Sequence, residues 1–87
     1  MTMAQIRVYS RPGCHLCEVL LDELLPLVRG VGQVKVIDVE TRPDWKSAYG
    51  SRIPVVEVDG RYVCQHRLDR KALRRALAGD QPSPAAS

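Results

Sequence analysis

The chain has 87 residues, which is enough for one small domain and excludes two separate hydrophobic cores. Its 45% apolar and 26% charged residues are typical of a globular protein, and the net charge of +3 is too small to indicate a nucleic-acid partner by itself. No run approaches the ~18 apolar residues of a membrane span, and residues 1–10 lack the apolar segment of a signal peptide, so we expect a cytoplasmic protein that does not bind membranes.

The first half of the chain predicts a strand, a helix and a second strand. Residues 5–9 alternate between apolar and polar side chains, as a half-buried strand does. Residues 10–13 form a turn sequence, and an apolar stripe at helical spacing follows it. We expect Pro26 to kink or end this helix near Leu24, because proline removes a backbone donor. Residues 34–39 are apolar and β-branched, which predicts the second strand.

The middle of the chain predicts a short helix and then a hairpin. Residues 43–49 favour a helix with Thr41 as its N-cap. Residues 54–58 and 61–64 are strand-like. They flank Asp59-Gly60, which is a strong signal for a two-residue hairpin turn.

The last part of the chain predicts a third helix. An apolar stripe runs over residues 72–77, and Asp69 is a suitable N-cap for it. The resulting order β-α-β-α-β-β-α predicts an α/β fold with a four-stranded mixed sheet flanked by helices. We expect one domain over residues 1–79 and a disordered, proline-rich tail over residues 80–87.

Two cysteines, Cys14 and Cys17, open the first helix directly after Pro12-Gly13. The unpaired N–H groups and the positive dipole of a helix N-terminus favour a thiolate at Cys14 and lower a cysteine pKa from ~8.5 to about 3.5–7.5. Cys17 falls on the apolar stripe, so we expect it to be sheltered while Cys14 is exposed. Such a pair suits dithiol exchange, in which the exposed thiolate attacks and the sheltered thiol resolves the mixed disulfide.

Two other interpretations of the Cys-x-x-Cys spacing stay open. A zinc or iron–sulfur site needs about four ligands, and the remaining candidates are His15, Cys64 and His66. The cysteines could also be core residues without a chemical role. The redox interpretation requires the two cysteines to be closer together than a regular helix places them. Cβ atoms three positions apart in a regular helix are ~5–6 Å apart, whereas a disulfide needs Cβ atoms about 3.5–4.5 Å apart. Cys14 must therefore precede the regular helix, which Pro12-Gly13 favours.

The arrangement resembles the thioredoxin fold and, within it, the glutaredoxins. VYSRPGCHLC looks like the glutaredoxin opening, in which a strand ends, a basic residue stands three positions before the first cysteine, and the dithiol follows. Ile53-Pro54 resembles the Val-Pro step of the family, whose proline is cis. The resemblance covers about residues 4 to 78. It implies a small dithiol thiol–disulfide oxidoreductase that reduces protein disulfides or glutathione mixed disulfides.

The resemblance also implies residue roles. Cys14 would be the nucleophile and Cys17 the resolving thiol. Pro54 would pack against the dithiol, and the backbone of Ile53 would pair with the backbone of the substrate. Arg11 matches the basic residue of the family, which would stabilise the thiolate or meet a glutathione carboxylate.

The chain departs from the glutaredoxin pattern after the fourth strand. Glutaredoxins that bind glutathione carry a Gly-Gly step there, whereas residues 64–69 read CQHRLD. Close backbone approach by the tripeptide needs such glycines, so the substrate stays open. We expect a monomer without a bound cofactor or metal, whose partner is a disulfide-containing protein or a glutathionylated substrate and whose electrons come from glutathione or a reductase. The alternative is a non-enzymatic adaptor or metal-binding module of the same fold.

Several side chains have both a functional and an ordinary interpretation. His15 lies between the cysteines, where its partial positive charge would tune Cys14 towards the thiolate. Arg52 stands beside the Ile-Pro step and is a candidate for substrate contact. Cys64 is either a third redox thiol or a small buried residue. The basic residues around the last helix form either a solvated face or a site for an anionic partner, and no aromatic residues interleave them, so we do not expect nucleic-acid binding.

Overall fold

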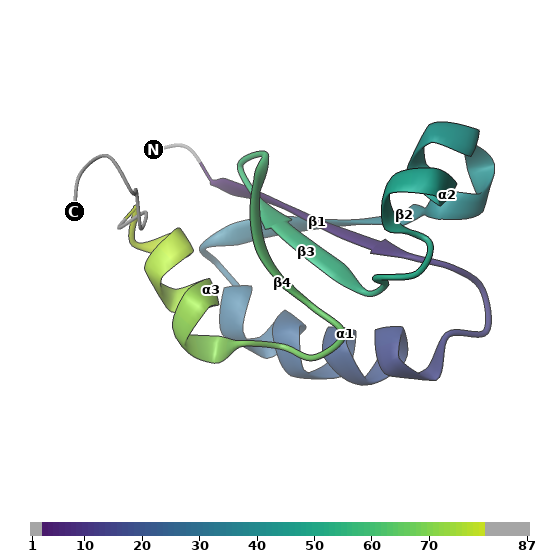
Figure 1. The fold of residues 1–87 in the computed structure, drawn as a ribbon. Coiled ribbons are helices and arrows are strands. Elements are labelled where there is room, and N and C mark those ends of the chain that lie inside the picture. The colour runs from purple at the N-terminus through teal and green to yellow at the C-terminus, as the bar shows by residue number, and fades with distance from the viewer. Residues whose placement is uncertain (1–2, 80–87) are drawn as a thin grey trace.

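The computed structural model describes residues 3–79, which form a four-stranded sheet with helices on both faces (Figure 1). The elements in chain order are β1 (Ala4–Ser10), α1 (His15–Val28), β2 (Gly32–Asp38), the 3-10 turn η1 (Val39–Thr41), α2 (Pro43–Tyr49), β3 (Val55–Val58), β4 (Arg61–Gln65) and α3 (Arg70–Leu77). This order confirms the α/β fold predicted from the sequence. The tail predicted for residues 80–87 lies outside the described residues.

The sheet has the order β2-β1-β3-β4 and is mixed. β1 and β2 are parallel, with α1 as the crossover that a parallel pair requires, and the pairs β1–β3 and β3–β4 are antiparallel. Asp59 and Gly60 both have positive φ, 52° and 82°, as the two-residue turn of a tight hairpin requires. At the carboxyl end of β1, the chain leaves the sheet at Ser10 and enters α1 at His15 after a short turn.

Each face of the sheet is covered by different helices. Ile6 and Val8 of β1 point towards α1 and α3, and they form the larger core cluster with the buried side chains of both helices. Tyr9 points to the opposite face, where α2 lies, and forms a second cluster with Ile37 and Val55. Figure 1 shows α1 and α3 below the sheet and α2 above it. The two clusters account for a three-layer arrangement in a chain of this size.

Of the two effects predicted for Pro26, a kink or an end of the first helix near Leu24, the end is wrong. α1 continues through Pro26 to Val28, although proline leaves one carbonyl of the preceding turn without its helical partner. Leu24 and Val28 are 0% and 2% exposed. Burying two such side chains contributes about 3–6 kcal/mol, against a cost of about 3 kcal/mol for a proline inside a helix. Tertiary packing therefore decides where this helix ends.

The prediction that Thr41 caps the second helix is also wrong. Thr41 belongs to η1, and its hydroxyl donates to the carbonyl oxygen of Asp38 at 2.7 Å. Arg42 is the N-cap of α2 and gives no side-chain cap, and Pro43 follows at the first helical position, where no N–H is needed. The Arg42 guanidinium instead makes two 3.0 Å hydrogen bonds to the Asp44 carboxylate, which hold the pKa of Asp44 below its usual value.

Candidate functional site

A tight turn positions Cys14 at the start of α1. The amide of Cys14 donates to the carbonyl oxygen of Arg11 at 3.3 Å, and Gly13 has a φ of 76°. Proline at the second position of a turn and a positive-φ glycine at the third are the requirements of a type II turn, which Pro12-Gly13 meets. The turn leaves Cys14 as the N-cap of α1 in an extended conformation, with φ −84° and ψ 105°.

Cys14 and Cys17 are joined by a disulfide, with their Cα atoms 5.2 Å apart. The two side chains reach each other because Cys14 precedes the first helical residue, as the sequence predicts. The Sγ of Cys14 also accepts the backbone N–H of Cys17 at 3.2 Å. A backbone donor and a helix N-terminus both stabilise negative charge on this sulfur when the pair is reduced.

The two cysteines differ in burial. Cys17 is 3% exposed and belongs to the cluster beneath α2, which confirms that it is the sheltered member of the pair. The prediction that Cys14 is exposed is only partly right. Cys14 is half-buried, because it packs against the same cluster. The pair is therefore asymmetric, and the sulfur nearer to solvent is also the one at the helix N-terminus.

Ile53 lies beside the dithiol, and Pro54 follows it directly before β3. Their peptide bond is cis, as the resemblance implies. Ile53 packs in the cluster that contains Cys17, and Pro54 is fully buried with its carbonyl oxygen accepting the N–H of His66 at 2.8 Å. Within residues 3–79, neither the amide nor the carbonyl of Ile53 is hydrogen-bonded to another protein group. The backbone of Ile53 is thus available to a substrate next to the cysteines.

A groove of about 670 Å³ lies beside Cys14. The turn before α1 contributes Arg11, Leu16 follows Cys14, and the facing side comes from η1, α2 and the loop that leads to Ile53. Two cations, Arg11 and Lys46, and one acid, Glu40, line it. Lys46 and Glu40 were not predicted as site residues, and no local signal in the sequence marks them, since they reach the groove only through the placement of α2 and η1.

The second helix is held to the sheet by an aromatic cluster that we call the tyrosine clamp: Tyr9 of β1, Tyr49 of α2 and Glu57 of β3. The rings of Tyr9 and Tyr49 stack at 4.0 Å, and the two hydroxyls donate to the two Glu57 carboxylate oxygens at 3.1 Å each. Burial, with the neighbouring Tyr9 and Glu57, raises the pKa of Tyr49 to about 12. Trp45 adds an edge contact to Tyr9 at 6.3 Å, so packing on this face of the sheet accounts for both Trp45 and Tyr49. No residue of α2 is fully buried. The contacts of Tyr49 and Trp45 with the sheet therefore hold α2 in place as one wall of the groove.

Two predicted site residues lie apart from the groove contacts. The guanidinium of Arg52 donates to the Gln65 side chain at 2.9 Å and to the carbonyl of Ala48 at 3.3 Å, and it does not line the groove. It also lies over the rings of Tyr49 and Tyr62. His15 is exposed on the first turn of α1, with its Nδ1 3.9 Å from a Glu18 carboxylate oxygen.

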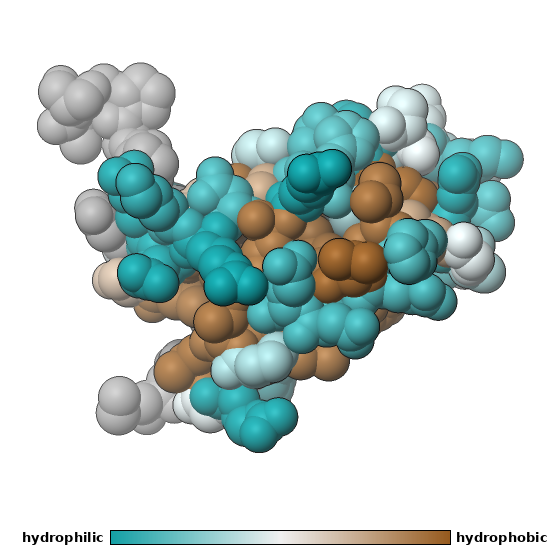
Figure 2. Space-filling model, turned by 90° about the horizontal axis from the view of Figure 1, so that it is seen from below, coloured by the Kyte–Doolittle hydropathy of each residue, from teal (hydrophilic) through white to brown (hydrophobic). Residues whose placement is uncertain are grey.

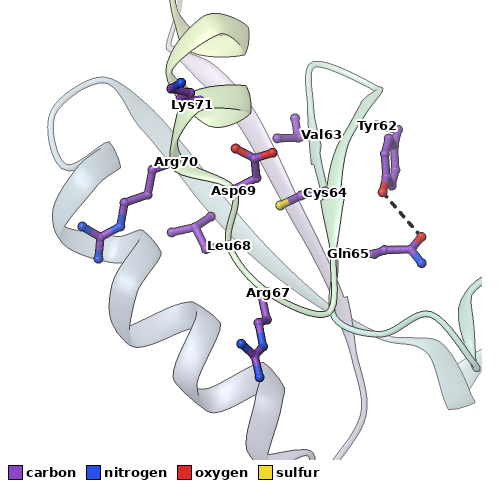
Figure 3. A pocket seen from close by; sticks show the side chains of 9 residues that line it. All are labelled: Tyr62, Val63, Cys64, Gln65, Arg67, Leu68, Asp69, Arg70 and Lys71. Carbon is purple, nitrogen blue, oxygen red and sulfur yellow. Dashed lines mark hydrogen bonds between the residues drawn. The ribbon is translucent and has the colours of Figure 1, made fainter.

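Cys64 lies in the core and not at the rim of the dithiol site. It is 6% exposed and packs with residues of the larger cluster, and a bulge opposite Val56 and Glu57 sets its orientation. Figure 3 shows its sulfur pointing into a hollow of about 790 Å³ between β4 and the start of α3, towards Asp69 and Leu68. Burial raises the pKa of the Cys64 thiol. This is the environment of a small buried residue, the ordinary interpretation of this cysteine.

Neither a metal cluster nor a membrane span is evident in the described part of the chain. Among residues 3–79, no three side chains of His, Cys, Asp or Glu converge as they would around a metal ion. No helix in the same range is both long and apolar enough to cross a bilayer.

Comparison with known proteins places these features in a family. Residues 5–78 match the glutaredoxin-like domain (DUF836). The uncharacterized protein Rv0508 of Mycobacterium tuberculosis is 30% identical over 84 residues, which cover 90% of this chain and 87% of that protein. The solution structure of protein Ne2328 from Nitrosomonas europaea has a TM-score of 0.77 at 26% identity, over 85% of this chain and 91% of the other.

A more distant likeness bears on the fold alone. A thioredoxin variant from Halobacterium salinarum has a TM-score of 0.60 at 24% identity, over 93% of this chain and 78% of the other. This chain thus has a thioredoxin-like fold, in which a mixed sheet is flanked by helices and a Cys-x-x-Cys lies at the start of α1. Because residues 5–78 match the glutaredoxin-like domain, the chain belongs to the glutaredoxin-like domain family.

Proposed function

We propose that this protein is a thiol–disulfide oxidoreductase that reduces disulfides through Cys14 and Cys17. The observation that carries the proposal is the asymmetry of the pair: the Sγ of Cys14 lies at a helix N-terminus, accepts the Cys17 N–H at 3.2 Å and borders an open groove, while Cys17 is 3% exposed within disulfide reach. An accessible stabilised thiolate beside a sheltered thiol suits the two steps of dithiol exchange.

In the proposed reaction the reduced protein transfers two electrons to the substrate. The Cys14 thiolate attacks one sulfur of a substrate disulfide, the other substrate sulfur leaves as a thiolate that takes up a proton, and a mixed disulfide forms. Cys17 then gives its proton to solvent and attacks the Sγ of Cys14, and the remaining substrate sulfur leaves as a thiolate that takes up a proton. The product is the Cys14–Cys17 disulfide, and each step replaces one S–S bond by another.

The surrounding residues support these two steps in the proposal. The unpaired backbone of Ile53 pairs with the substrate backbone beside Cys14, and Pro54, which is fully buried and hydrogen-bonded to His66, fixes the position of Ile53. Arg11 stabilises the Cys14 thiolate or an anionic substrate from the edge of the groove. His15 adds positive charge near Cys14 whenever its imidazole is protonated. Arg52 stays a weaker candidate for substrate contact, because its guanidinium is already hydrogen-bonded.

The reaction requires an electron donor that the chain does not carry. Two glutathione molecules, which become glutathione disulfide, or the dithiol of a reductase would return the Cys14–Cys17 disulfide to its reduced form. The substrate class in this proposal is a disulfide-containing protein or a glutathione mixed disulfide. Such a cycle operates where thiols are kept reduced, so we assign the protein to the cytoplasm. We also expect it to work as a monomer, because one chain carries both cysteines of the cycle.

Trapping of mixed disulfides tests the assigned roles of the two cysteines. Cys17→Ser removes the resolving thiol, so we expect it to accumulate covalent complexes with substrate that a reductant releases. Cys14→Ser keeps a thiol that is 3% exposed, and we expect it to trap about tenfold less or none. Mass spectrometry of complexes recovered from cells measures the difference and identifies the partners. Equal trapping by the two variants would contradict the assignment.

A further inference from the structure

A second hollow adjoins the dithiol groove at Leu16. It has a volume of about 340 Å³ and lies between α1 and the loop that joins β4 to α3. Its apolar part is formed by Leu16, Val19, Leu20 and Leu68. Leu16 also lines the groove beside Cys14, so the two hollows form one continuous surface that starts at the reactive sulfur.

The apolar part of this surface is open to solvent. Leu16 is 45% exposed and Val19 is 41% exposed, one turn apart on the outer flank of α1. Figure 2 shows the molecule from the side of α1, where apolar side chains lie in the middle of the face and towards its lower left edge, with hydrophilic side chains among and around them. A contiguous exposed apolar patch with a polar rim is typical of a surface that binds a partner, and this one begins beside Cys14.

The rim of the hollow is basic. His66 and Arg67 border it on the loop side, and its one acid, Glu23, is already engaged by Arg70 at 3.3 Å. No ion pair holds Arg67 within residues 3–79, and the same is true of Arg11 and Lys46 at the groove. One acid without an ion pair in the same range, Glu40, lines the groove beside Arg11 and Lys46. The continuous surface therefore carries an excess of positive charge, with Arg67 on one side of Leu16 and Arg11 and Lys46 on the other, which complements an acidic ligand.

The loop that carries this rim is fixed to the wall of the dithiol site. The amide of His66 donates to the carbonyl of Pro54 at 2.8 Å, and the amide of Arg67 donates to the carbonyl of Gln65 at 2.7 Å. His66 has a φ of 67°, which is uncommon for a residue other than glycine, and the two hydrogen bonds hold the backbone in this conformation. The rim is thus preorganised relative to Ile53-Pro54, and this lowers the entropic cost of binding a chain across it.

We infer that this surface docks an extended segment of a disulfide-bearing partner protein, with the reactive cysteine at Cys14, an apolar side chain over Leu16 and Val19, and a carboxylate at Arg67. The inference rests on the proposed function and names its substrate class. A small disulfide occupies only the groove beside Cys14, whereas a protein segment also covers the exposed apolar side chains beyond Leu16. The protein therefore selects protein disulfides with apolar and acidic residues beside the cysteine.

Peptide mixed disulfides measure this selectivity directly. Short synthetic peptides carry one cysteine bonded to a chromogenic aromatic thiol, with either leucine and aspartate or serine and lysine beside it. We expect the reduced protein to release the chromogenic thiol about tenfold faster from the leucine–aspartate peptide, through apolar burial and charge pairing. Arg67→Glu is expected to lower the ratio of the two rates by about fivefold, and Val19→Ser to lower it likewise. The ratio within one variant cancels any change in thiolate chemistry.

A matched variant and a non-covalent assay complete the test. Arg75→Glu makes the same change in net charge as Arg67→Glu, but on the exposed part of α3 outside both hollows. It should therefore leave the ratio of the two release rates unchanged. Binding of the same peptides with serine in place of cysteine, read by fluorescence anisotropy on the oxidised protein, tests docking without chemistry. Equal affinity for both peptides, or concentration-dependent self-association through Leu16 and Val19, would overturn the docking inference. Release of no thiol from any disulfide would instead overturn the proposed function.

Discussion

At the scale of single residues, the three cysteines have different positions in the fold, and these positions determine their reactivity. Cys14 lies at a helix N-terminus beside a groove, Cys17 lies one turn inward in a buried cluster, and Cys64 lies in the core below the sheet. Only the first combines access with backbone groups that stabilise a thiolate. Burial raises the pKa of Cys64, so it stays a neutral thiol through neutral pH and contributes packing, not chemistry.

This difference predicts the order in which the thiols react. In the fully reduced protein near neutral pH, we expect iodoacetamide to alkylate Cys14 first and Cys64 at least about tenfold more slowly, because the thiolate is the nucleophile and Cys64 is 6% exposed. Peptide mapping by mass spectrometry measures the rates. In denaturant the difference should vanish, which is the control. Alkylation of native Cys64 as fast as Cys14, or a shifted dithiol titration in Cys64→Ala, would refute its structural role.

At the scale of elements, α2 depends on contacts to the sheet more than on its own sequence. The helix has no side-chain N-cap and no fully buried residue, yet it supplies Lys46 and Ser47 to the groove. The stacked rings of Tyr9 and Tyr49 and their shared acceptor Glu57 fix its position. The tyrosine clamp is thus the connection between the sheet and the groove wall that faces Cys14.

The clamp predicts a pH dependence at high pH. The pKa of Tyr49 in the fold, about 12, lies above its ordinary value of 10.0, so the neutral phenol contributes stability that is fully present below pH 10 and is lost as pH rises towards 12. We expect the free energy of unfolding of the wild type, measured in urea, to fall more steeply over this interval than that of Tyr49→Phe. Tyr62→Phe, which removes a hydroxyl from a residue that is 55% exposed, is the control. Parallel curves for wild type and Tyr49→Phe would contradict the raised pKa of Tyr49 and show that its hydroxyl does not stabilise the fold through the bond to Glu57.

At the scale of the whole molecule, local patterns in the sequence determine the elements, and long-range contacts determine the rest. Alternation in residues 5–9, the Asp59-Gly60 turn and the Asp69 cap, whose carboxylate accepts the Ala72 amide at 3.0 Å, each act within a few residues, and each is correctly predicted. The end of α1 was predicted wrongly, because burial of Val28 outweighs the local effect of Pro26.

The candidate site divides in the same way. The turn, the helix start and the sheltered position of Cys17 follow from SRPGCHLC, since all lie in one short segment. The groove partners Glu40 and Lys46 and the clamp acid Glu57 come from segments brought together only by the sheet and α2. No periodicity or motif records such juxtapositions, so the wall opposite the dithiol could not be predicted from the sequence.

Redox titration of the purified protein in glutathione buffers tests most directly whether Cys14 and Cys17 form a reversible dithiol couple. We predict a single two-electron transition, with a tenfold change in the ratio of the two forms for every ~30 mV of potential, and a mass change that maps to Cys14 and Cys17 alone. Cys64 should stay open to alkylation after denaturation at every potential. Cysteines that never form an intramolecular disulfide, or a tightly bound stoichiometric metal in the same preparation, would contradict the oxidoreductase function.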